Sequence, residues 1–124
     1  MRARETYEGR PLDELPVNEV DWSHRGDHIR TRTKRYPDRP EEFDVEPEWA
    51  TEAALDPHSV RATTGGVSIE VVGLSPSATP REQGDAGRIL KVWLVPKDIN
   101  IGSWWGASAC DANAEDRDSY KEAE

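Results

Sequence analysis

The clearest alternation of apolar and polar positions lies in the last third of the chain. Between Ile89 and Val95, the side chains of Leu90, Val92 and Leu94 share one face of an extended segment. This period of two is typical of a β-strand. The segment GSWWGASA at 102–109 predicts a following strand, in which the adjacent Trp104 and Trp105 must point to opposite faces. We therefore expect the core to form against this pair of strands.

Two further strands are expected upstream. The alternation of Val67, Ile69 and Val71 with polar residues indicates a half-buried strand. A short strand is also expected at 60–63. Between them, Thr64-Gly65-Gly66 is a hairpin turn signal. The segment 75–86 is rich in Pro, Ser, Gly and Gln and is expected to be a mobile loop.

Three segments have helical features. A helix is predicted from about Glu46, with Pro47 in its first turn and a stop at Asp56-Pro57. Asn113 is a good N-cap for a C-terminal helix. The segment 28–36 has two interpretations: its β-branched residues alternate as in a strand, whereas helical spacing places His28, Arg32 and Tyr36 on one face.

This order of elements predicts an α+β fold, with two N-terminal helices, an antiparallel sheet of about four strands and a C-terminal helix, the helices lying on one side of the sheet. The expected domain spans residues 27–124. Residues 1–26 show no sustained periodicity and contain two prolines, so a flexible N-terminal arm is expected there. An apolar content of 35% agrees with part of the chain lying outside the core.

The charge distribution changes this picture locally. The net charge of −9 argues against a protein that coats nucleic acid, because phosphate binding requires a cationic surface. Between His24 and Arg39, however, six Lys or Arg residues face only two Asp residues. We call residues 24–39 the basic segment and interpret it as a localised site. The seven acidic residues between 41 and 56 are interpreted as a solvated face.

Other site chemistry is limited. The single cysteine, Cys110, excludes an internal disulfide and a cysteine-based zinc cluster. His24, Asp27 and His28 have no third well-spaced ligand, so neither a metal nor a cofactor is expected. No run of residues is apolar and long enough for a signal peptide or a membrane span, which predicts a cytoplasmic protein without membrane contact.

Three patches resemble the BrnT family, small bacterial toxins of type II toxin–antitoxin systems with a RelE-like fold. They are the basic segment leading into PEEFDVEPEWATEAALDPHSV, the pair VSIEVVGLS and GRILKVWLV, and the tail ASACDANAEDRDSYKE. The resemblance covers about residues 28–123 and favours the helical interpretation of 28–36. Cys110 and Asp111 stand where the family pattern has two arginines.

The resemblance implies a metal-independent endoribonuclease that cleaves mRNA, inhibits translation and is neutralised by a cognate antitoxin. Such chemistry needs a base for the ribose 2′-hydroxyl and cations for the phosphate. The implied catalytic residues are His28, Arg32 and Lys91. The implied RNA-binding residues are Arg30, Lys34, Arg35, Arg61 and Arg88. The expected partner-binding residues are Trp104, Trp105 and Tyr120.

Two alternatives remain open. The same scaffold could be a non-catalytic interaction module that uses its tryptophans and basic segment, or its acidic surface could bind a basic protein. A cleft that gathers His28, Arg32, Arg61 and Lys91 would favour the nuclease. Their distribution over separate faces would favour the binding module.

Overall fold

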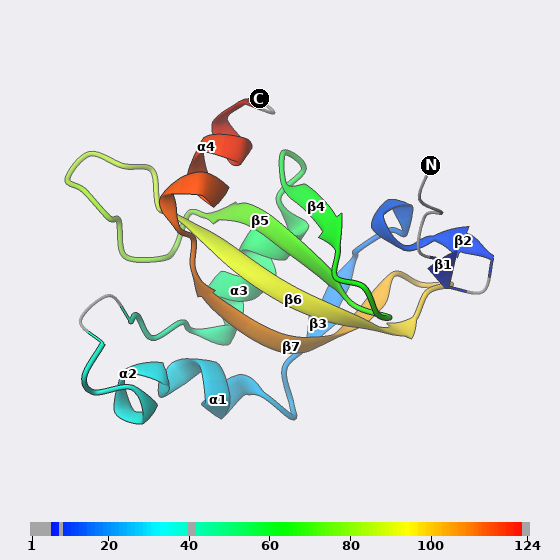
Figure 1. Cartoon of the computed structure of the whole chain (residues 1–124), viewed down its shortest axis with the longest axis horizontal. Coiled ribbons are helices and arrows are strands. Elements are labelled where there is room, and N and C mark those ends of the chain that lie inside the picture. Colours follow the sequence, from blue (N-terminus) through cyan, green and yellow to red (C-terminus); the bar gives the residue numbers. More distant parts are fainter. Residues whose placement is uncertain (1–5, 8, 40–41, 123–124) are drawn as a thin grey trace.

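The computed structural model is an α+β fold built on a five-stranded mixed sheet, and it describes residues 6–7, 9–39 and 42–122. Figure 1 shows the helix α3 behind the sheet and α4 at one end of it. The elements, in chain order, are β1 (Thr6–Tyr7), β2 (Arg10–Pro11), the 3₁₀ helix η1 (Leu12–Glu14), β3 (Glu19–Asp21), α1 (Gly26–Arg30), α2 (Arg32–Arg35), α3 (Pro47–Leu55), β4 (Val60–Thr63), β5 (Ile69–Ser75), β6 (Arg88–Asp98), β7 (Ser103–Asp111) and α4 (Ala114–Glu122).

The sheet has the strand order β3-β7-β6-β5-β4. The four strands predicted from alternation are present and pair antiparallel in sequence order. The fifth strand, β3, pairs parallel with β7, with Val20 opposite Trp104. The prediction of a purely antiparallel sheet of about four strands is therefore corrected to five strands with one parallel pair.

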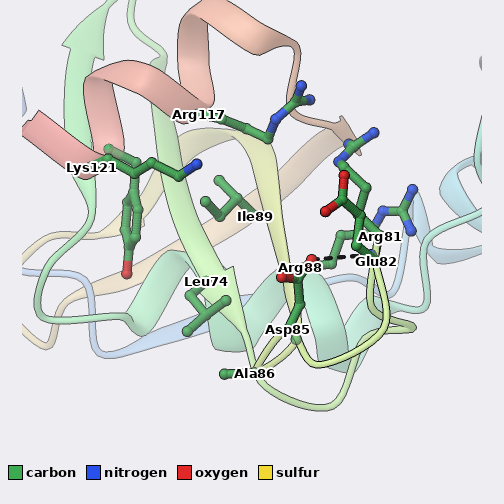
Figure 2. Close-up of a pocket in the computed structure, with 11 residues that line it drawn as sticks. Leu74, Arg81, Glu82, Asp85, Ala86, Arg88, Ile89, Arg117 and Lys121 are labelled. Carbon is green, nitrogen blue, oxygen red and sulfur yellow. Dashed lines mark hydrogen bonds between the residues drawn. The ribbon is translucent and has the colours of Figure 1, made fainter.

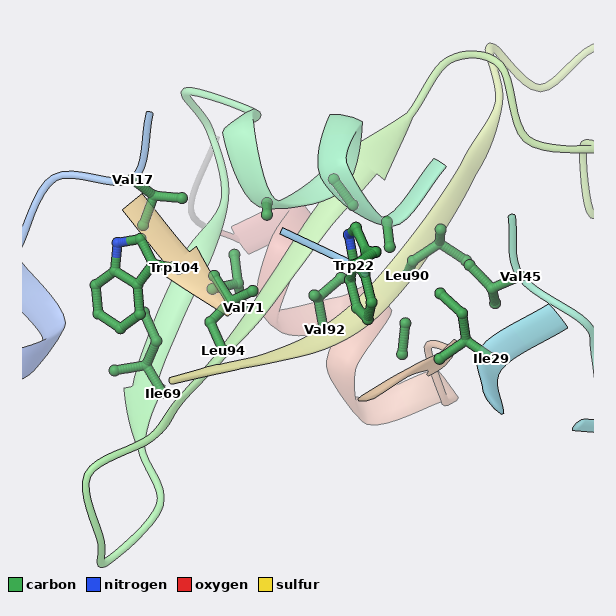
Figure 3. Packing of buried hydrophobic residues seen from close by; sticks show 14 of the residues in the cluster. Val17, Trp22, Ile29, Val45, Ile69, Val71, Leu90, Val92, Leu94 and Trp104 are labelled. Carbon is green, nitrogen blue, oxygen red and sulfur yellow. The ribbon is translucent and has the colours of Figure 1, made fainter. Parts of the chain in front are cut away.

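The main core lies between α3 and one face of the sheet (Figure 3). Leu90, Val92 and Leu94 are fully buried on this face, as their alternation predicted, and Trp104 is fully buried beside Val17 and Ile69. A smaller cluster on the opposite face joins Tyr120 and Ala112 to Val72. Because Val72 points away from the core face that holds Val71, α4 and α3 lie on opposite faces of the sheet. This corrects the expectation that all helices share one side.

The predicted flexible arm is part of this core where the structure describes it. Leu12 and Leu15 are buried, Trp22 is 9% exposed, and Asn18 and Glu19 both donate backbone hydrogen bonds to the Gly102 carbonyl. Residues 1–5 and 8 of the predicted arm lie outside the described residues. In the described part of the predicted arm, Leu12, Leu15 and Trp22 therefore contribute side chains to the core.

The helix predictions were right in position and incomplete in detail. The helix α3 begins after Glu46 and ends before Asp56, as expected, and Asn113 Oδ1 caps α4 by accepting from the Asp116 amide at 2.8 Å. The segment 28–36 is helical in two short pieces that are separated at Thr31. The Thr31 hydroxyl donates to the Asp27 carbonyl. This side-chain hydrogen bond satisfies a backbone carbonyl of α1 at the point where the helix is interrupted.

Close packing of α3 on β5 depends on a residue without a side chain. A Cβ atom at Gly73 would lie 2.0 Å from the Ala53 carbonyl oxygen. We expect Gly73→Ala to lower the free energy of unfolding by about 3 kcal/mol, because α3 must move to relieve the overlap. Urea denaturation measures this loss. The matched control is Gly66→Ala, which meets no atom within 4 Å; equal stability of the two variants would contradict the prediction.

Candidate functional site

The basic segment is held against the sheet by a few apolar and backbone contacts. Ile29 is fully buried, and its carbonyl accepts from the Val45 amide at 2.9 Å. Trp22, just before the segment, lies so close to Gly106 that a Cβ there would meet the indole ring at 2.4 Å. Arg25 Nε donates to the Ala107 carbonyl at 3.2 Å. These contacts place α1 beside β7.

His28 is the central titratable group of this surface. Arg35 Nη1 donates to His28 Nδ1. The pKa of His28 is lowered from 6.5, first by burial and then by the positive charges of Arg35, Arg25 and Arg32. Both effects disfavour the imidazolium. The imidazole is therefore neutral at physiological pH, and its unprotonated nitrogen, Nδ1, accepts the hydrogen bond from Arg35.

A cluster of three guanidinium groups surrounds Tyr36. The guanidinium carbons of Arg32, Arg35 and Arg39 lie 5.5, 5.6 and 4.4 Å from the centre of its ring. Cation–π contacts of this kind hold cations on an aromatic face without neutralising their charge. This cluster and His28 bring together three of the site residues expected from the sequence, His28, Arg32 and Arg35.

Two carboxylates of the predicted solvated face, Glu42 and Glu46, instead form ion pairs with the basic segment, whereas Glu48 is exposed and Glu41 lies outside the described residues. Glu42 forms ion pairs with Arg32 and, at 3.6 Å, with Arg39. Glu46 pairs with Arg30 at 3.1 Å. Each of these acidic residues follows its arginine partners by 3–16 positions in the chain. Together they neutralise part of the basic segment. Within the described residues, Lys34 and Arg35 have no carboxylate partner.

Lys91 lies on the face of the sheet that α4 covers, opposite Cys110 on β7. Its ammonium is 3.4 Å from Asp116 and 3.7 Å from Glu70, and it lies 5.5 Å from the centre of the Trp93 ring. Burial raises the pKa of Cys110 to about 11, while Arg32 and Lys91 both act to lower it. Lys91 is engaged in ion pairs of its own.

The other two predicted phosphate ligands lie elsewhere. Arg61, on the edge strand β4, donates from Nη1 to the Leu15 carbonyl at 2.6 Å, and burial lowers its pKa. Arg88 donates from Nε to Asp111 at 2.9 Å, and its guanidinium lies 3.9 Å from the centre of the Phe43 ring. Neither joins the His28 cluster. Arg61 thus lies apart from His28 and Arg32, and such a separation was expected to favour the binding module.

The predicted partner-binding residues divide into two groups. Trp104 is fully buried and donates from Nε1 to the Pro16 carbonyl at 2.9 Å, and Tyr120 is 4% exposed with its hydroxyl on Asp56. Both side chains are therefore buried within the chain, and their contacts join elements of the fold. Trp105 is partly exposed between the His24 ring, 4.8 Å away, and the Lys97 ammonium at 4.4 Å.

The charge of Arg35 offers a test of this electrostatic description. We expect Arg35→Gln to raise the pKa of His28 towards 6.5, because the variant lacks a positive charge that disfavours the imidazolium. An NMR titration of the imidazole protons measures the midpoint. Arg39→Gln removes an equal charge from the same Tyr36 ring and should leave the midpoint in place. Identical midpoints in both variants would show that the charge of Arg35 does not lower the pKa of His28.

Comparison of the chain with protein-family models, with curated proteins and with solved structures finds no match. No group of three or more His, Cys, Asp or Glu side chains suited to hold a metal occurs in residues 6–7, 9–39 and 42–122. In that part of the chain, no helix has the length and apolar character needed to cross a membrane.

Proposed function

We propose that the protein is an RNA-directed endoribonuclease, the toxin component of a type II toxin–antitoxin system, with its site on α1 and α2. The observation that carries the proposal is the neutral imidazole of His28 held among the guanidinium groups of Arg25, Arg32 and Arg35. A base that is unprotonated at neutral pH, beside cations able to hold a phosphate, meets the two requirements of RNA cleavage without a metal.

The proposed reaction is a transesterification within the RNA. Arg35 turns from His28 Nδ1 to the phosphate, and the freed Nδ1 takes the proton of a ribose 2′-hydroxyl. The 2′-oxygen attacks the neighbouring phosphorus, and the bond to the 5′-oxygen breaks. The departing 5′-oxygen takes up one proton, so that the charge balances and a 2′,3′-cyclic phosphate remains. Arg35 and Lys34, without carboxylate partners among the described residues, are the phosphate-holding cations. Lys91 has no part in this proposal because Asp116 and Glu70 hold its ammonium.

The toxin context rests on the resemblance to the BrnT family and its RelE-like fold. The sequence patches that carry this resemblance lie on α3, on β5 and β6, and on the segment from β7 into α4. A cognate antitoxin and a cytoplasmic location belong to the same proposal. The partly exposed Trp105 is the aromatic residue best placed for an antitoxin contact, since Trp104 and Tyr120 are buried.

The second candidate function is a non-catalytic interaction module. It is favoured by the internal partners of Arg61, Arg88 and Lys91, which leave these side chains in structural contacts instead of a shared cleft. On this alternative, the basic segment binds an acidic protein surface. The two candidates differ in whether RNA is a substrate.

The deciding experiment uses the purified chain and a labelled single-stranded RNA in the presence of EDTA. The nuclease predicts fragments that end in a 2′,3′-cyclic phosphate, and it predicts no cleavage of the same sequence as DNA, which lacks the 2′-hydroxyl. Induced expression in a bacterial host should then arrest growth with loss of mRNA. Intact RNA in the first assay and normal growth in the second would overturn the nuclease and leave the interaction module.

A further inference from the structure

A groove lies where β5 ends and β6 begins, between α4 and the loop that joins these two strands. Its volume is about 420 Å³, and its lining includes Leu74, Ile89, Arg81, Arg117 and Lys121. Figure 2 shows the arginine side chains gathered at one end of the groove, with Leu74 and Ile89 between them and Lys121. This volume falls in the range of ordinary small-ligand pockets, roughly 300–1,000 Å³.

One end of the groove carries an excess of positive charge. Arg81 and Arg88 both pair with the single carboxylate of Asp111. Arg81 Nη2 and Arg117 Nη1 donate to the same acceptor, the Ala112 carbonyl, at 3.3 and 2.8 Å. Three guanidinium groups therefore converge on one carboxylate and one carbonyl. Each guanidinium has five N–H donors, so donors remain for an anion.

The rest of the groove has a different character. Leu74 and Ile89 are partly exposed on its floor, where they pack against the cluster of Val72, Ala112 and Tyr120. Glu82 and Asp85 are exposed on the loop side. Asp85 Oδ2 accepts from the Glu82 amide at 3.0 Å, which holds both carboxylates in one turn. The groove thus combines cationic donors, an apolar floor and acceptors on one rim.

We propose that this groove is a nucleotide-binding subsite. The phosphate lies on Arg81 and Arg117, the base lies over Leu74 and Ile89, and an exocyclic amino group of the base donates to Glu82 or Asp85. A nucleotide monophosphate unit presents these three features in this order: an anion, a flat apolar ring and a donor edge. An amino-bearing base such as adenine satisfies all three.

The subsite adds a nucleotide-binding site to the proposed nuclease. It rests on that proposed function only for the claim that the bound nucleotide is part of an RNA strand. Glu42 pairs with Arg32 in the basic segment, and the next residue, Phe43, carries the Arg88 guanidinium on its ring. Two consecutive residues therefore connect the Tyr36 cluster to the groove. In this proposal, a single RNA strand that passes His28 continues over Glu42 and Phe43 to the groove.

The test is calorimetric titration of the whole chain with adenosine 5′-monophosphate, adenosine and inorganic phosphate. We expect saturable binding of the nucleotide and at least tenfold weaker binding of adenosine, which lacks the phosphate. Arg117→Gln should weaken nucleotide binding by roughly tenfold, the effect of one lost charge-assisted hydrogen bond. Arg10→Gln, on the exposed β2, is the matched charge control and should bind as the parent does.

A second variant tests the location without removing charge. Ala86 is exposed and lines the groove, so Ala86→Trp should fill it and abolish nucleotide binding with an unchanged melting temperature. Nucleotide binding that is no tighter than that of inorganic phosphate, or equal binding by Arg117→Gln and Arg10→Gln, would overturn the subsite.

Competition distinguishes the source of the nucleotide. Displacement of bound mononucleotide by a short single-stranded RNA assigns the groove to the RNA strand. Retention of the mononucleotide assigns it to a free nucleotide. His28→Ala should bind the mononucleotide as the parent does, so failure of RNA cleavage and failure of the subsite are separate results.

Discussion

Replacement of His28 by alanine is expected to lower the rate of RNA cleavage by about 10²–10⁴-fold, the usual contribution of a general base. The parent protein should show a rate that rises with pH and reaches a plateau, with a midpoint below 6.5. The reason is that burial, together with Arg35, Arg25 and Arg32, lowers the pKa of His28, and only the neutral imidazole can accept the 2′-hydroxyl proton. Single-turnover cleavage of a labelled RNA between pH 5 and 8 measures both quantities.

The control for this experiment is His58→Ala. His58 is exposed in the turn between α3 and β4, far along the chain from the basic segment. The His58→Ala variant should cleave RNA at the parent rate. Circular dichroism should show that both variants are folded. A His28→Ala protein with the parent rate and pH profile would remove His28 from the site. Loss of RNA binding without change in the bound-state rate would instead make the imidazole a positioning residue.

Replacement of Asp56 by asparagine is expected to lower the free energy of unfolding at pH 7 by about 2–4 kcal/mol. Asp56 Oδ2 accepts from the Tyr120 hydroxyl at 2.6 Å and from the Leu74 amide at 2.9 Å, and Oδ1 accepts from the His58 amide at 2.9 Å. The carboxylate therefore joins the end of α3, the strand β5 and α4. Asparagine has a single acceptor oxygen, so one of these donors would face an NH₂ group.

The effect of Asp56→Asn should depend on pH in a defined direction. Burial of Asp56 acts to raise its pKa, but the hydrogen bonds from Tyr120, Leu74 and His58 outweigh it, and the pKa is lowered. A carboxyl group with a lowered pKa stabilises the fold above its unfolded-state pKa of about 3.9, and this contribution is lost as the pH falls through the folded-state value. The difference in stability between parent and variant should therefore be full at pH 7 and shrink below about pH 4.

Urea denaturation at pH 7 and pH 3 measures this dependence. Asp118→Asn is the matched control, since Asp118 is exposed on α4, and it should change stability by no more than about 0.5 kcal/mol. A constant difference between parent and Asp56→Asn at both pH values would contradict the proposed role of the ionised carboxylate. The experiment also tests the docking of α4, which forms one wall of the groove.

The partial neutralisation of the basic segment bears on how tightly RNA can bind. Glu42 and Glu46 occupy three of the arginines, so the number of phosphates that the surface can neutralise is smaller than the number of basic residues. Few phosphate contacts produce a shallow dependence of affinity on salt. In the proposed function, the groove beyond Phe43 supplies further contacts to the phosphates of the RNA. The subsite would thereby strengthen RNA binding.

The sequence by itself determined the local elements and their faces. The alternation around Val92 placed Leu90 and Leu94 in the core, Pro47 and Asp56 bounded α3, and Asn113 capped α4, because these signals depend only on residues a few positions apart. The side chains of Trp104 and Trp105 point to opposite faces for the same reason. The α+β class followed from the order of the elements.

Only the tertiary structure decided which distant segments meet. Leu12 and Leu15 have no regular spacing, and they are buried because the core beside β4 and β7 is incomplete without them. Pairing of β3 with β7 joins residues more than 80 positions apart, and ion pairs between residues 30–39 and 42–46 depend on how the chain turns between them. The groove likewise takes Arg81 from a loop and Arg117 from α4. Such contacts are set by packing and charge pairing in three dimensions, which no local pattern in the sequence specifies.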